Sequence, residues 1–325
     1  MAARYRLIEL LADGRFHSGE ALGEALSMSR TAVWKHIRQL AQLGLEVHAV
    51  RGRGYRLARP LELLDRSVIE AGLGSAAARR LQALDLFHDI DSTSDHLKRS
   101  CVPLAGGRGR ACLAEWQRAG RGRRGRGWVS PYGSNLYLSL AWGFEGGLEN
   151  PGGLSLAAAV AVLRALRRIG IDDAGLKWPN DILLDGGKLA GILLELAGEA
   201  SGPVTVVTGV GVNIGMPEQA AGDIDQPWSD LGRRLREPSR NRLAVLLLEE
   251  LSAAMEDFGV RGLAGFLDEW QRHDLIDGRD IRLRIGERVV RGRACGVDAQ
   301  GALVMQDGAG LRRYHAGEVS VRFDA

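Results

Sequence analysis

The first 45 residues carry apolar side chains at the three- and four-residue spacing of amphipathic helices. This spacing predicts helices over residues 4–12, 19–26 and 30–43. Ser18 and Ser29 precede the second and third of these helices and are suited to cap them. Three short helices of this kind, the last two joined by a brief turn, are typical of a helix-turn-helix unit.

Two short segments of alternating pattern, 45–50 and 55–57, follow the third helix and flank a Gly-containing turn over residues 51–54. Helices followed by such a hairpin predict a winged helix-turn-helix. A small helical domain with an incidental hairpin is the alternative. It is less favoured because the third helix and the hairpin turn are both basic, as a DNA-binding unit requires.

The pattern changes after Pro60, where residues 61–72 predict a connecting helix, and it becomes mixed α/β from about residue 84. The expected strands are 111–116, 136–142, 176–178, 182–184, 189–196 and 204–213. The expected helices, which would cover the sheet, are 154–169, 240–258 and 262–272.

The last 50 residues alternate in short segments separated by Gly or Asp, a pattern that predicts a small β-barrel. Its expected strands are 281–285, 288–296, 302–306, 312–316 and 319–323. The chain as a whole is thus predicted to be an α+β multidomain protein. We place the domains at residues 1–62, 63–275 and 276–325.

Positive charge is concentrated at the N-terminus. Residues 1–59 hold ten Lys and Arg against five Asp and Glu, a net charge of +5, which leaves −2 for the rest of a chain whose total is +3. A local excess of this kind suits a polyanion such as DNA, although it is also compatible with a merely solvated face. Only four of the 43 basic residues are lysines: Lys35, Lys98, Lys177 and Lys188. Where arginine serves as the general cation, the remaining lysines are enriched in positions that need a compact ammonium.

Several classes of function lack their signatures. Cys101, Cys112 and Cys295 lie far apart, so we expect no zinc site or disulfide and interpret all three as reduced, buried thiols. The apolar stretch 7–12 is too short for a signal peptide or membrane span, which favours a cytoplasmic protein. P-loop, serine-elbow and H-E-x-x-H motifs are absent, and we assign no role to the seven scattered histidines.

The densest chemical signal is an arginine- and glycine-rich segment, QRAGRGRRGRGW, at residues 117–128. Its glycines permit close backbone approach and its guanidinium groups can grip phosphate or carboxylate. An RNA-binding arginine-glycine tail is the alternative, but such tails are long and terminal, whereas this segment is brief and lies between two expected strands. We therefore predict a mobile loop that binds an anionic substrate and closes over it.

Two further segments gather polar groups at strand ends. KWPND at 177–181 combines an ammonium, an amide and a carboxylate around a proline, although taken alone it could be an Asx turn beside a surface lysine. GKLAGILLE at 187–195 places Lys188 at the start of an apolar strand, which we expect to neighbour the strand of Lys177. TGVGVNIG at 208–215 ends another strand with small residues that let a ligand lie against the backbone.

Taken together with Asp91-Ser92-Thr93, these motifs resemble the biotin protein ligases, and with the N-terminal unit the chain is similar to those that also repress the biotin operon. The resemblance covers residues 5 to 323. It implies a central ligase domain related to class II synthetase-like folds and a C-terminal SH3-like β-barrel. It also implies two steps: biotin and ATP give biotinyl-5′-AMP and pyrophosphate, and a lysine of the biotin carboxyl carrier protein then displaces AMP.

The resemblance also implies residue roles. Lys188 and Arg123 would be catalytic. The biotin-binding residues would be Ser92, Thr93, Gln117, Gly120, Arg121, Arg123, Lys188 and Gly191. The ATP-binding residues would be Trp128, Lys177, Asn180, Asp181, Asn213 and Arg322. Asp181 would also hold Mg²⁺. Ser94 stands where the family usually has asparagine, and we do not count it as a biotin contact.

In the repressor half, the expected DNA contacts lie on the third helix and the wing: Ser29, Arg30, Thr31, Trp34, Lys35, Arg51 and Arg53. Operator DNA is the expected partner, bound by a homodimer that forms when biotinyl-5′-AMP is held. Two alternatives remain, a non-enzymatic ligand-sensing winged-helix repressor and a lipoate or octanoate protein ligase. An RNA-binding protein is a third, but it would require stacking aromatics, and these are only 6% of the chain.

Overall fold

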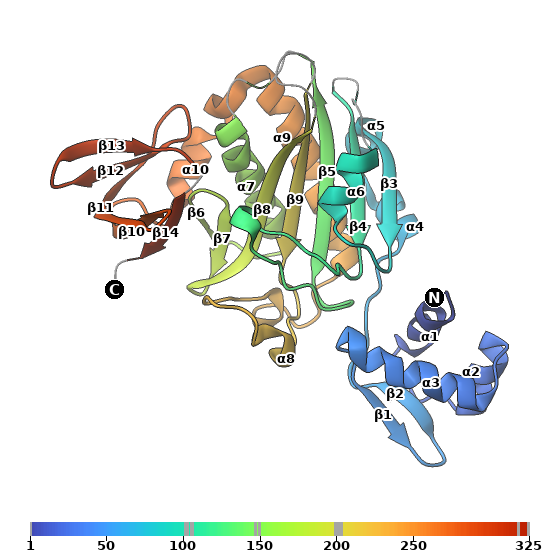
Figure 1. The fold of residues 1–325 in the computed structure, drawn as a ribbon. Helices are drawn as coiled ribbons and strands as arrows, with labels where there is room; N and C mark the ends of the chain where they lie inside the picture. Colours follow the sequence, from blue (N-terminus) through green and yellow to red (C-terminus); the bar gives the residue numbers. More distant parts are fainter. Residues whose placement is uncertain are drawn as a thin grey trace.

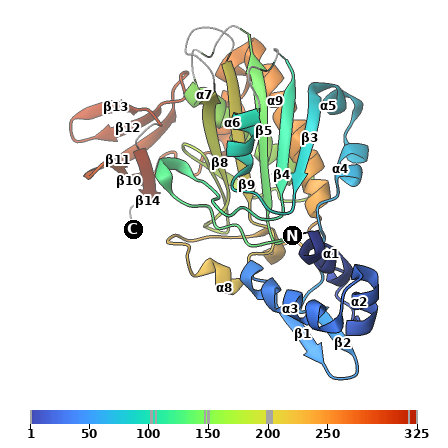
Figure 2. The same cartoon turned by 45° about the vertical axis from the view of Figure 1, so that its right-hand side comes forward.

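We describe a computed structural model of the chain over residues 2–100, 104, 107–145, 148, 151–197, 204–316 and 319–323. The N-terminal unit consists of α1 (Ala2–Leu11), α2 (Gly19–Leu26), α3 (Arg30–Leu40), the 3-10 turn η1 (Ala41–Leu43), β1 (Val47–Val50) and β2 (Gly54–Leu57). Ser18 and Ser29 cap α2 and α3 by accepting hydrogen bonds from backbone N–H groups. The predicted winged helix is confirmed, and Figures 1 and 2 show it at one end of the central domain, below the sheet in both views.

The predicted connecting helix over residues 61–72 is wrong in its first half. Only α4 (Arg66–Gly72) is helical, and the carboxylate of Asp65, directly before it, caps it. The preceding residues are extended because their backbone is bound elsewhere: the Leu64 N–H donates to the carboxylate of Glu115 and the Asp65 N–H to Asn241 Oδ1 at 2.8 Å. Glu115 is itself buried in an ion pair with Arg240 at 2.7 Å, so the linker is fixed to the central domain.

The central domain is built on one seven-stranded sheet of order β3-β4-β5-β9-β8-β7-β6. All neighbours are antiparallel except β3 and β4. The strands are β3 (Leu81–Phe87), β4 (Gly109–Ala114), β5 (Leu136–Phe144), β6 (Gly175–Lys177), β7 (Asp181–Leu184), β8 (Gly187–Ala197) and β9 (Val204–Val212). The sequence missed β3. It also expected the strands of Lys177 and Lys188 to be neighbours, whereas β7 lies between them.

Helices cover both faces of this sheet because its central strands are apolar on both sides. On β4, Leu113 packs into the main core with α7 (Pro151–Arg167) and α9 (Arg240–Arg261), as predicted. Cys112 points the other way, into a smaller cluster with Leu97 of α6 (Thr93–Ser100). Three more helices are short: α5 (Ser75–Arg80), α8 (Glu218–Ala221) and α10 (Leu267–His273). Three 3-10 turns complete the domain: η2 (Arg123–Gly125), η3 (Leu231–Arg233) and η4 (Gly262–Gly265).

The C-terminal unit is a five-stranded antiparallel sheet of order β13-β12-β11-β10-β14, so the expected small β domain is confirmed. Its strands are β10 (Asp280–Ile285), β11 (Arg288–Val297), β12 (Leu303–Asp307), β13 (Gly310–Tyr314) and β14 (Val319–Phe323). The unit is tied to the central domain by Trp178, whose buried indole N–H donates to Gly301 O at 3.0 Å. Figure 1 shows β14 and β10 on the side that faces β7.

The two cysteines that the structure describes differ in burial, and only one of them agrees with the expectation of buried thiols. Cys112 is buried as expected, but Cys295 is exposed, because it alternates with the inward-facing Ala294 on β11, and Cys101 lies outside the described residues. Across the described part of the chain, no helix combines the length and apolar character that crossing a membrane would need.

Candidate functional site

The predicted substrate residues converge on one cavity of about 420 Å³, which opens over the β8 and β9 side of the central sheet. Of the fourteen residues expected to bind biotin or ATP, only Gly120 is absent from its lining. Gly120 lies just beneath, where an added Cβ would be 2.6 Å from Trp128 O and 2.7 Å from Ser130 Oγ. The cavity has two chemically different ends, one of neutral hydroxyl and amide groups and one of cations.

The neutral end is a compact cluster at the first turn of α6. Gln117 Oε1 accepts hydrogen bonds from the Thr93 N–H at 3.0 Å and the Thr93 hydroxyl at 3.1 Å. Ser139, on β5, lies 2.8 Å from the Thr93 hydroxyl and 2.9 Å from that of Ser94. Ser94 was left out of the predicted contacts, yet it is buried and lines the cavity with Ser92. Buried hydroxyls held this way are fixed donors and acceptors for a neutral polar ligand.

The arginine-glycine segment forms an ordered loop over this cavity. Its two arms are joined by hydrogen bonds from Trp128 N to Gly120 O at 2.8 Å and from Gly122 N to Arg126 O at 2.7 Å. At its tip, Arg124 adopts the left-handed backbone conformation, with φ of 60°. The loop folds on its own backbone hydrogen bonds, so its side chains are available for contacts with the cavity and with α6 and β8.

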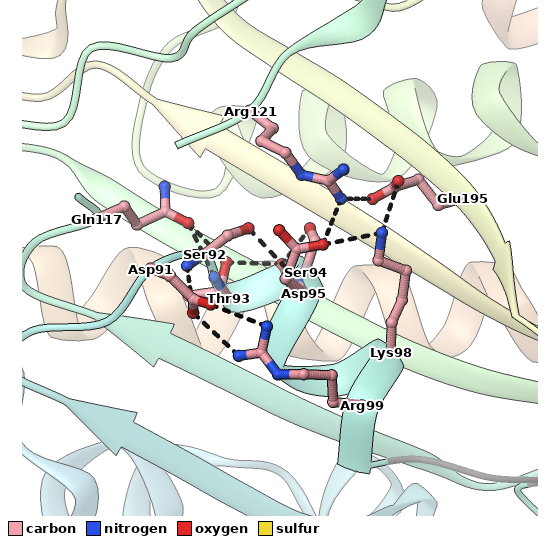
Figure 3. A network of polar contacts seen from close by, with 11 residues as sticks. Asp91, Ser92, Thr93, Ser94, Asp95, Lys98, Arg99, Gln117, Arg121 and Glu195 are labelled. Atoms are coloured by element: carbon pink, nitrogen blue, oxygen red, sulfur yellow. Dashed lines mark hydrogen bonds and ion pairs between the residues drawn. The ribbon is translucent and has the colours of Figure 1, made fainter. Parts of the chain in front are cut away.

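Arg121 anchors this loop to the domain through a four-residue ion-pair network, drawn in Figure 3. Its guanidinium pairs with Glu195 on β8 and lies 2.9 Å from Asp95 on α6. Lys98 lies 2.9 Å from each of the same two carboxylates. Although burial acts to lower the pKa of Lys98, its hydrogen bonds to Asp95 and Glu195 raise it above the ordinary value. Arg121, predicted to hold substrate anions, is thus occupied by protein carboxylates here.

The floor of the cavity is made of glycine backbone under the Trp128 ring. A Cβ on Gly211 would come within 2.4 Å of the ring, and one on Gly191 within 3.0 Å. Only glycine allows this approach at either strand position. The indole N–H of Trp128 is buried and has no hydrogen-bond acceptor among the described residues.

The cationic end gathers charges from β6, β8 and β14. Lys188 Nζ forms an ion pair with Asp181 Oδ1 at 2.6 Å and lies 5.5 Å from the centre of the Trp128 ring. Burial, supported by the charges of Arg322 and Lys188 and opposed by Asp181, lowers the pKa of Lys177 to about 8. Lysine is destabilised as a cation at such a position unless an anion arrives.

Two amides and a guanidinium complete this end. Arg123 donates to Asn180 Oδ1 at 3.1 Å and to the carbonyl of Ala316, and burial lowers the pKa of Arg123. Asn213 donates to the Lys188 carbonyl at 3.2 Å and to the Ser229 carbonyl at 3.1 Å, so it also fixes the backbone that carries Lys188. Arg322 donates to Gln226 Oε1 at 3.1 Å.

Sequence reasoning missed the segment from Met216 to Trp228, part of which closes the cavity. Asp223, Ile224, Asp225, Gln226 and Trp228 contribute to the lining. The segment is fastened beside β8 by hydrogen bonds from Lys188 N to Pro227 O at 2.9 Å and from Ser229 N to Lys188 O at 3.0 Å. Its one signal in the sequence was a tryptophan after an acidic, glycine-containing stretch, which matches no chemical motif.

Three carboxylates line the cavity, Asp181, Asp223 and Asp225, and Asp181 is the one at the cationic end beside Lys188. No group of three or more His, Cys, Asp or Glu side chains comes together in the ranges that the structure covers. Mg²⁺ often takes only one or two protein carboxylates and completes its shell with phosphate oxygens and water. The donor set fits Mg²⁺ brought with a nucleotide and does not fit a metal held by protein alone.

The winged-helix residues predicted to contact DNA lie on one exposed helix and one exposed hairpin, except that Ser29 is engaged as the cap of α3. Trp34 is 45% exposed and has the Arg38 guanidinium over its ring at 4.9 Å. Arg53 of the wing lies 4.2 Å from the ring centre of Phe16. Arg38 and Phe16 were not among the predicted contacts, because only the folded structure brings them into these ring contacts.

Three known protein families match successive parts of the chain. Residues 87–213 match the biotin/lipoate A/B protein ligase family, residues 4–56 match an HTH domain, and residues 278–322 match the biotin protein ligase C-terminal domain.

The bifunctional ligase/repressor BirA of Escherichia coli K12 is 41% identical over 98% of this chain and 96% of that protein. The protein of the same name from Bacillus subtilis is 31% identical over 98% of each chain. Among solved structures, the biotin protein ligase from Aquifex aeolicus in complex with biotin and ATP is similar, with a TM-score of 0.64 and 26% identity over 75% of this chain and all of that one.

Proposed function

The chain belongs to the family of bifunctional biotin protein ligases and repressors, and from this premise we propose which of its residues bind substrate, catalyse the reaction and contact DNA. The protein is an ATP-dependent ligase that makes biotinyl-5′-AMP and transfers biotin to a lysine of the biotin carboxyl carrier protein. It is also a biotin-responsive repressor. The observation that carries the proposal is that one cavity has a neutral hydroxyl end and a cationic end. One molecule with a neutral polar head and a carboxylate tail fits across it.

The neutral end binds the biotin head. Ser92, Thr93 and Gln117 are buried or half-buried and hydrogen-bonded to fixed partners, so they offer oriented donors and acceptors. At Gly191 on β8, the place of a Cβ is taken by Lys188 and Trp128, 2.9 and 3.0 Å from it. The biotin chain passes beside this strand with its carboxylate toward Lys188. The Gly120 loop, with Arg121, closes over this end and excludes water from the product.

The cationic end performs the first step. A biotin carboxylate oxygen attacks the α-phosphorus of ATP, and positive charge must stabilise the anions that are pressed together there. Lys188 takes this role, because its ammonium is already at the junction of the two ends and can exchange its contact with Asp181 for substrate. Arg123, held beside Asn180, acts on the same phosphate oxygens.

Asp181, released from Lys188, would hold Mg²⁺, which supplies charge neutralisation on the phosphate oxygens. Trp128 covers the adenine. The phosphates and ribose are surrounded by Lys177 of β6, Arg322 of β14, Asn180 of the turn between β6 and β7, and Asn213 directly after β9. In the second step, the amine of the acceptor lysine attacks the acyl carbon and AMP leaves.

The winged helix binds operator DNA through α3 and the wing. Two such units are needed for two half-sites, so the repressor acts as a homodimer, formed when biotinyl-5′-AMP is held. We propose that the protein works in the cytoplasm, where operator DNA and ATP are both present. The divisions at 62/63 and 275/276 stay predictions.

The decisive experiment incubates the protein with Mg-ATP and biotin, with lipoate and octanoate in parallel, and separates the products by chromatography. We expect biotinyl-5′-AMP with biotin alone. Lys188→Ala should abolish the product, whereas Lys35→Ala, on the DNA-facing helix, should retain it. Adenylates of lipoate or octanoate would change the substrate class, and no adenylate from any acid would leave a ligand-sensing repressor.

A further inference from the structure

The segment from Met216 to Trp228, part of which closes the cavity, is a loop whose two ends lie together. It leaves the sheet after β9, contains α8 (Figure 1) and returns to the turn η3. Backbone hydrogen bonds join the two ends, from Leu231 N to Asn213 O at 3.2 Å and from Gly232 N to Ile214 O at 2.8 Å. The position of such a loop is set by the contacts at its base.

Asp230 ties the start of this loop to the turn that follows it. Its Oδ2 accepts a hydrogen bond from the Met216 N–H at 3.0 Å, and its Oδ1 accepts one from the Arg233 N–H at 3.2 Å. The residue is buried, so a backbone N–H that lost this partner would lose free energy of hydrogen bonding without gaining water. One carboxylate therefore fixes the backbone on both sides of the loop.

Asn135 holds the same base from the side of the sheet. It directly precedes β5 and has no exposed surface. Its Oδ1 accepts hydrogen bonds from the Ile214 N–H at 2.8 Å and the Gly215 N–H at 3.4 Å, and its carbonyl accepts one from Arg240 Nε at 3.0 Å. The chain is thus fixed immediately after Asn213, where the loop begins.

The base of the loop places two side chains that line the cavity. Asn213 directly precedes the backbone that Asn135 holds, and Trp228 lies two positions before Asp230. Arg233, whose N–H is bound by Asp230, has its guanidinium 4.6 Å from the centre of the Trp228 ring. The backbone at Trp228 also pairs with the start of β8, which carries the cationic end. A displaced base would therefore displace both side chains.

We propose that Asp230 and Asn135 are positioning residues for the nucleotide, a proposal that rests on the function proposed above. Neither belongs to the lining of the cavity, so they act through Asn213 and Trp228. Because they hold both ends of the loop before ATP arrives, less conformational entropy is lost when ATP binds. The biotin head binds at the other end of the cavity, so its affinity does not depend on this order.

The test compares KM for ATP, KM for biotin and kcat in biotinyl-5′-AMP synthesis by the full-length protein. In Asp230→Ala, the loss of two hydrogen bonds should raise KM for ATP about tenfold, while KM for biotin and kcat at saturating ATP stay near the parent values. Asn135→Ala should raise KM for ATP in the same way. Asp230→Asn keeps one acceptor oxygen, so its KM for ATP should be intermediate, and it takes the place of Asp230→Ala if that variant does not fold.

Asp65→Ala is the matched control. The Asp65 carboxylate also accepts hydrogen bonds from two backbone N–H groups, those of Ser67 at 2.8 Å and Val68 at 3.2 Å, but it caps α4. This control should keep the KM for ATP of the parent. A merely structural role of Asp230 would lower the fraction of active protein, and with it kcat, without a selective change in KM for ATP.

The outcomes separate the positioning role from the ligase function. A rise in KM for ATP in Asp230→Ala and Asn135→Ala, but not in the control, supports the proposal. An unchanged KM for ATP, an equal rise in KM for biotin or an equal rise in the control would overturn it, even if the parent makes adenylate. If the parent makes no adenylate, the ligase assignment fails and calorimetry with Mg-ATP decides: weaker binding to both variants supports the positioning role, and binding equal to that of the parent overturns it.

Discussion

At the scale of single residues, the site is defined by exchangeable charge pairs. Lys188 is held by Asp181, and Arg121 is held by Glu195 and Asp95, so the cations that substrate needs are kept paired with protein carboxylates. A paired cation costs less to bury than an isolated one. When substrate binds, its anions would replace the protein carboxylates as partners of these cations. The carboxylates therefore affect substrate binding as much as the cations do.

Glu195 is expected to control how long the loop stays closed. In Glu195→Gln, Arg121 and Lys98 both lose a carboxylate partner, so biotinyl-5′-AMP should leave several-fold faster. These side chains are partly exposed, so a loss on the order of 1 kcal/mol or less is expected. Release measured by chase with unlabelled ligand checks this. Arg99→Gln on α6, which breaks the pair with Asp91 before that helix, is the control, and equal release rates in the two variants would exclude this role of Glu195.

Lys177 predicts a pH dependence of nucleotide binding. Its pKa is about 8 in the ligand-free protein and lies below the ordinary value, so the side chain loses its charge as pH rises through 8. ATP affinity should therefore fall between pH 7 and 9, by less than tenfold per pH unit. The decline should be smaller in Lys177→Gln. Calorimetry at three pH values would measure this, and parallel profiles for the two proteins would rule Lys177 out as the cause.

Only some of the residues of the site could be predicted from the sequence. Lys177, Asp181 and Lys188 stand in motifs whose polar groups are adjacent along the chain. Ser139 is invisible in this way, because it is one hydroxyl within the apolar strand β5 and meets Thr93 only after β5 pairs beside β4. Glu195 was within a quoted motif, but its contact with Arg121 spans 74 positions of sequence.

At the scale of elements, apolar patterning decided which parts could be predicted. The strands β5, β8 and β9 and the helices α7 and α9 are strongly apolar, and each was expected close to its observed bounds. In contrast, α6 has the sequence TSDHLKRS, in which Leu97 is the one large apolar residue, so its periodicity is too weak to detect. It forms because Leu97 packs in a small cluster with Cys112.

The glycine floor under Trp128 gives a prediction at this scale. Gly211→Ala would place a methyl group 2.4 Å from the ring and force Trp128 away from β9. We expect ATP affinity to fall at least tenfold, about 1.4 kcal/mol, with the fold retained. Gly215→Ala lies in the same segment, where a Cβ would meet its nearest atom at an ordinary 3.7 Å. If both variants bind ATP with the affinity of the parent, close packing of Trp128 on Gly211 is not required for ATP binding.

At the scale of the whole molecule, the winged helix is joined to the ligase domain by specific contacts. Tyr5 donates to Asp89 at 2.8 Å and stacks on His88 with ring centres 4.7 Å apart. Asp89 also pairs with Arg118, at the base of the substrate loop. The DNA-binding unit and the substrate loop thus share one carboxylate. No local pattern predicted this, because it joins residues 84 positions apart.

DNA binding by this unit should depend steeply on salt. The logarithm of operator affinity should fall with the logarithm of salt concentration, with a slope of about −0.9 per phosphate contact. Arg51→Gln should make that slope shallower by about one contact and weaken binding to all sequences alike. Arg66→Gln, an exposed arginine of α4 on the ligase side, should leave the slope unchanged. An affinity independent of salt would argue against contact through α3 and the wing.

The scarcity of lysine bears on self-acylation. An acyl-adenylate that escapes reacts with any accessible amine, including those of the protein that made it. Lys98 and Lys188 are held in ion pairs and Lys177 is buried, which leaves Lys35 as the exposed lysine side chain. Acylation by released adenylate would therefore occur at Lys35 on the DNA-facing helix and remove a positive charge there. A ligase that releases its adenylate would in this way lower its own affinity for operator DNA.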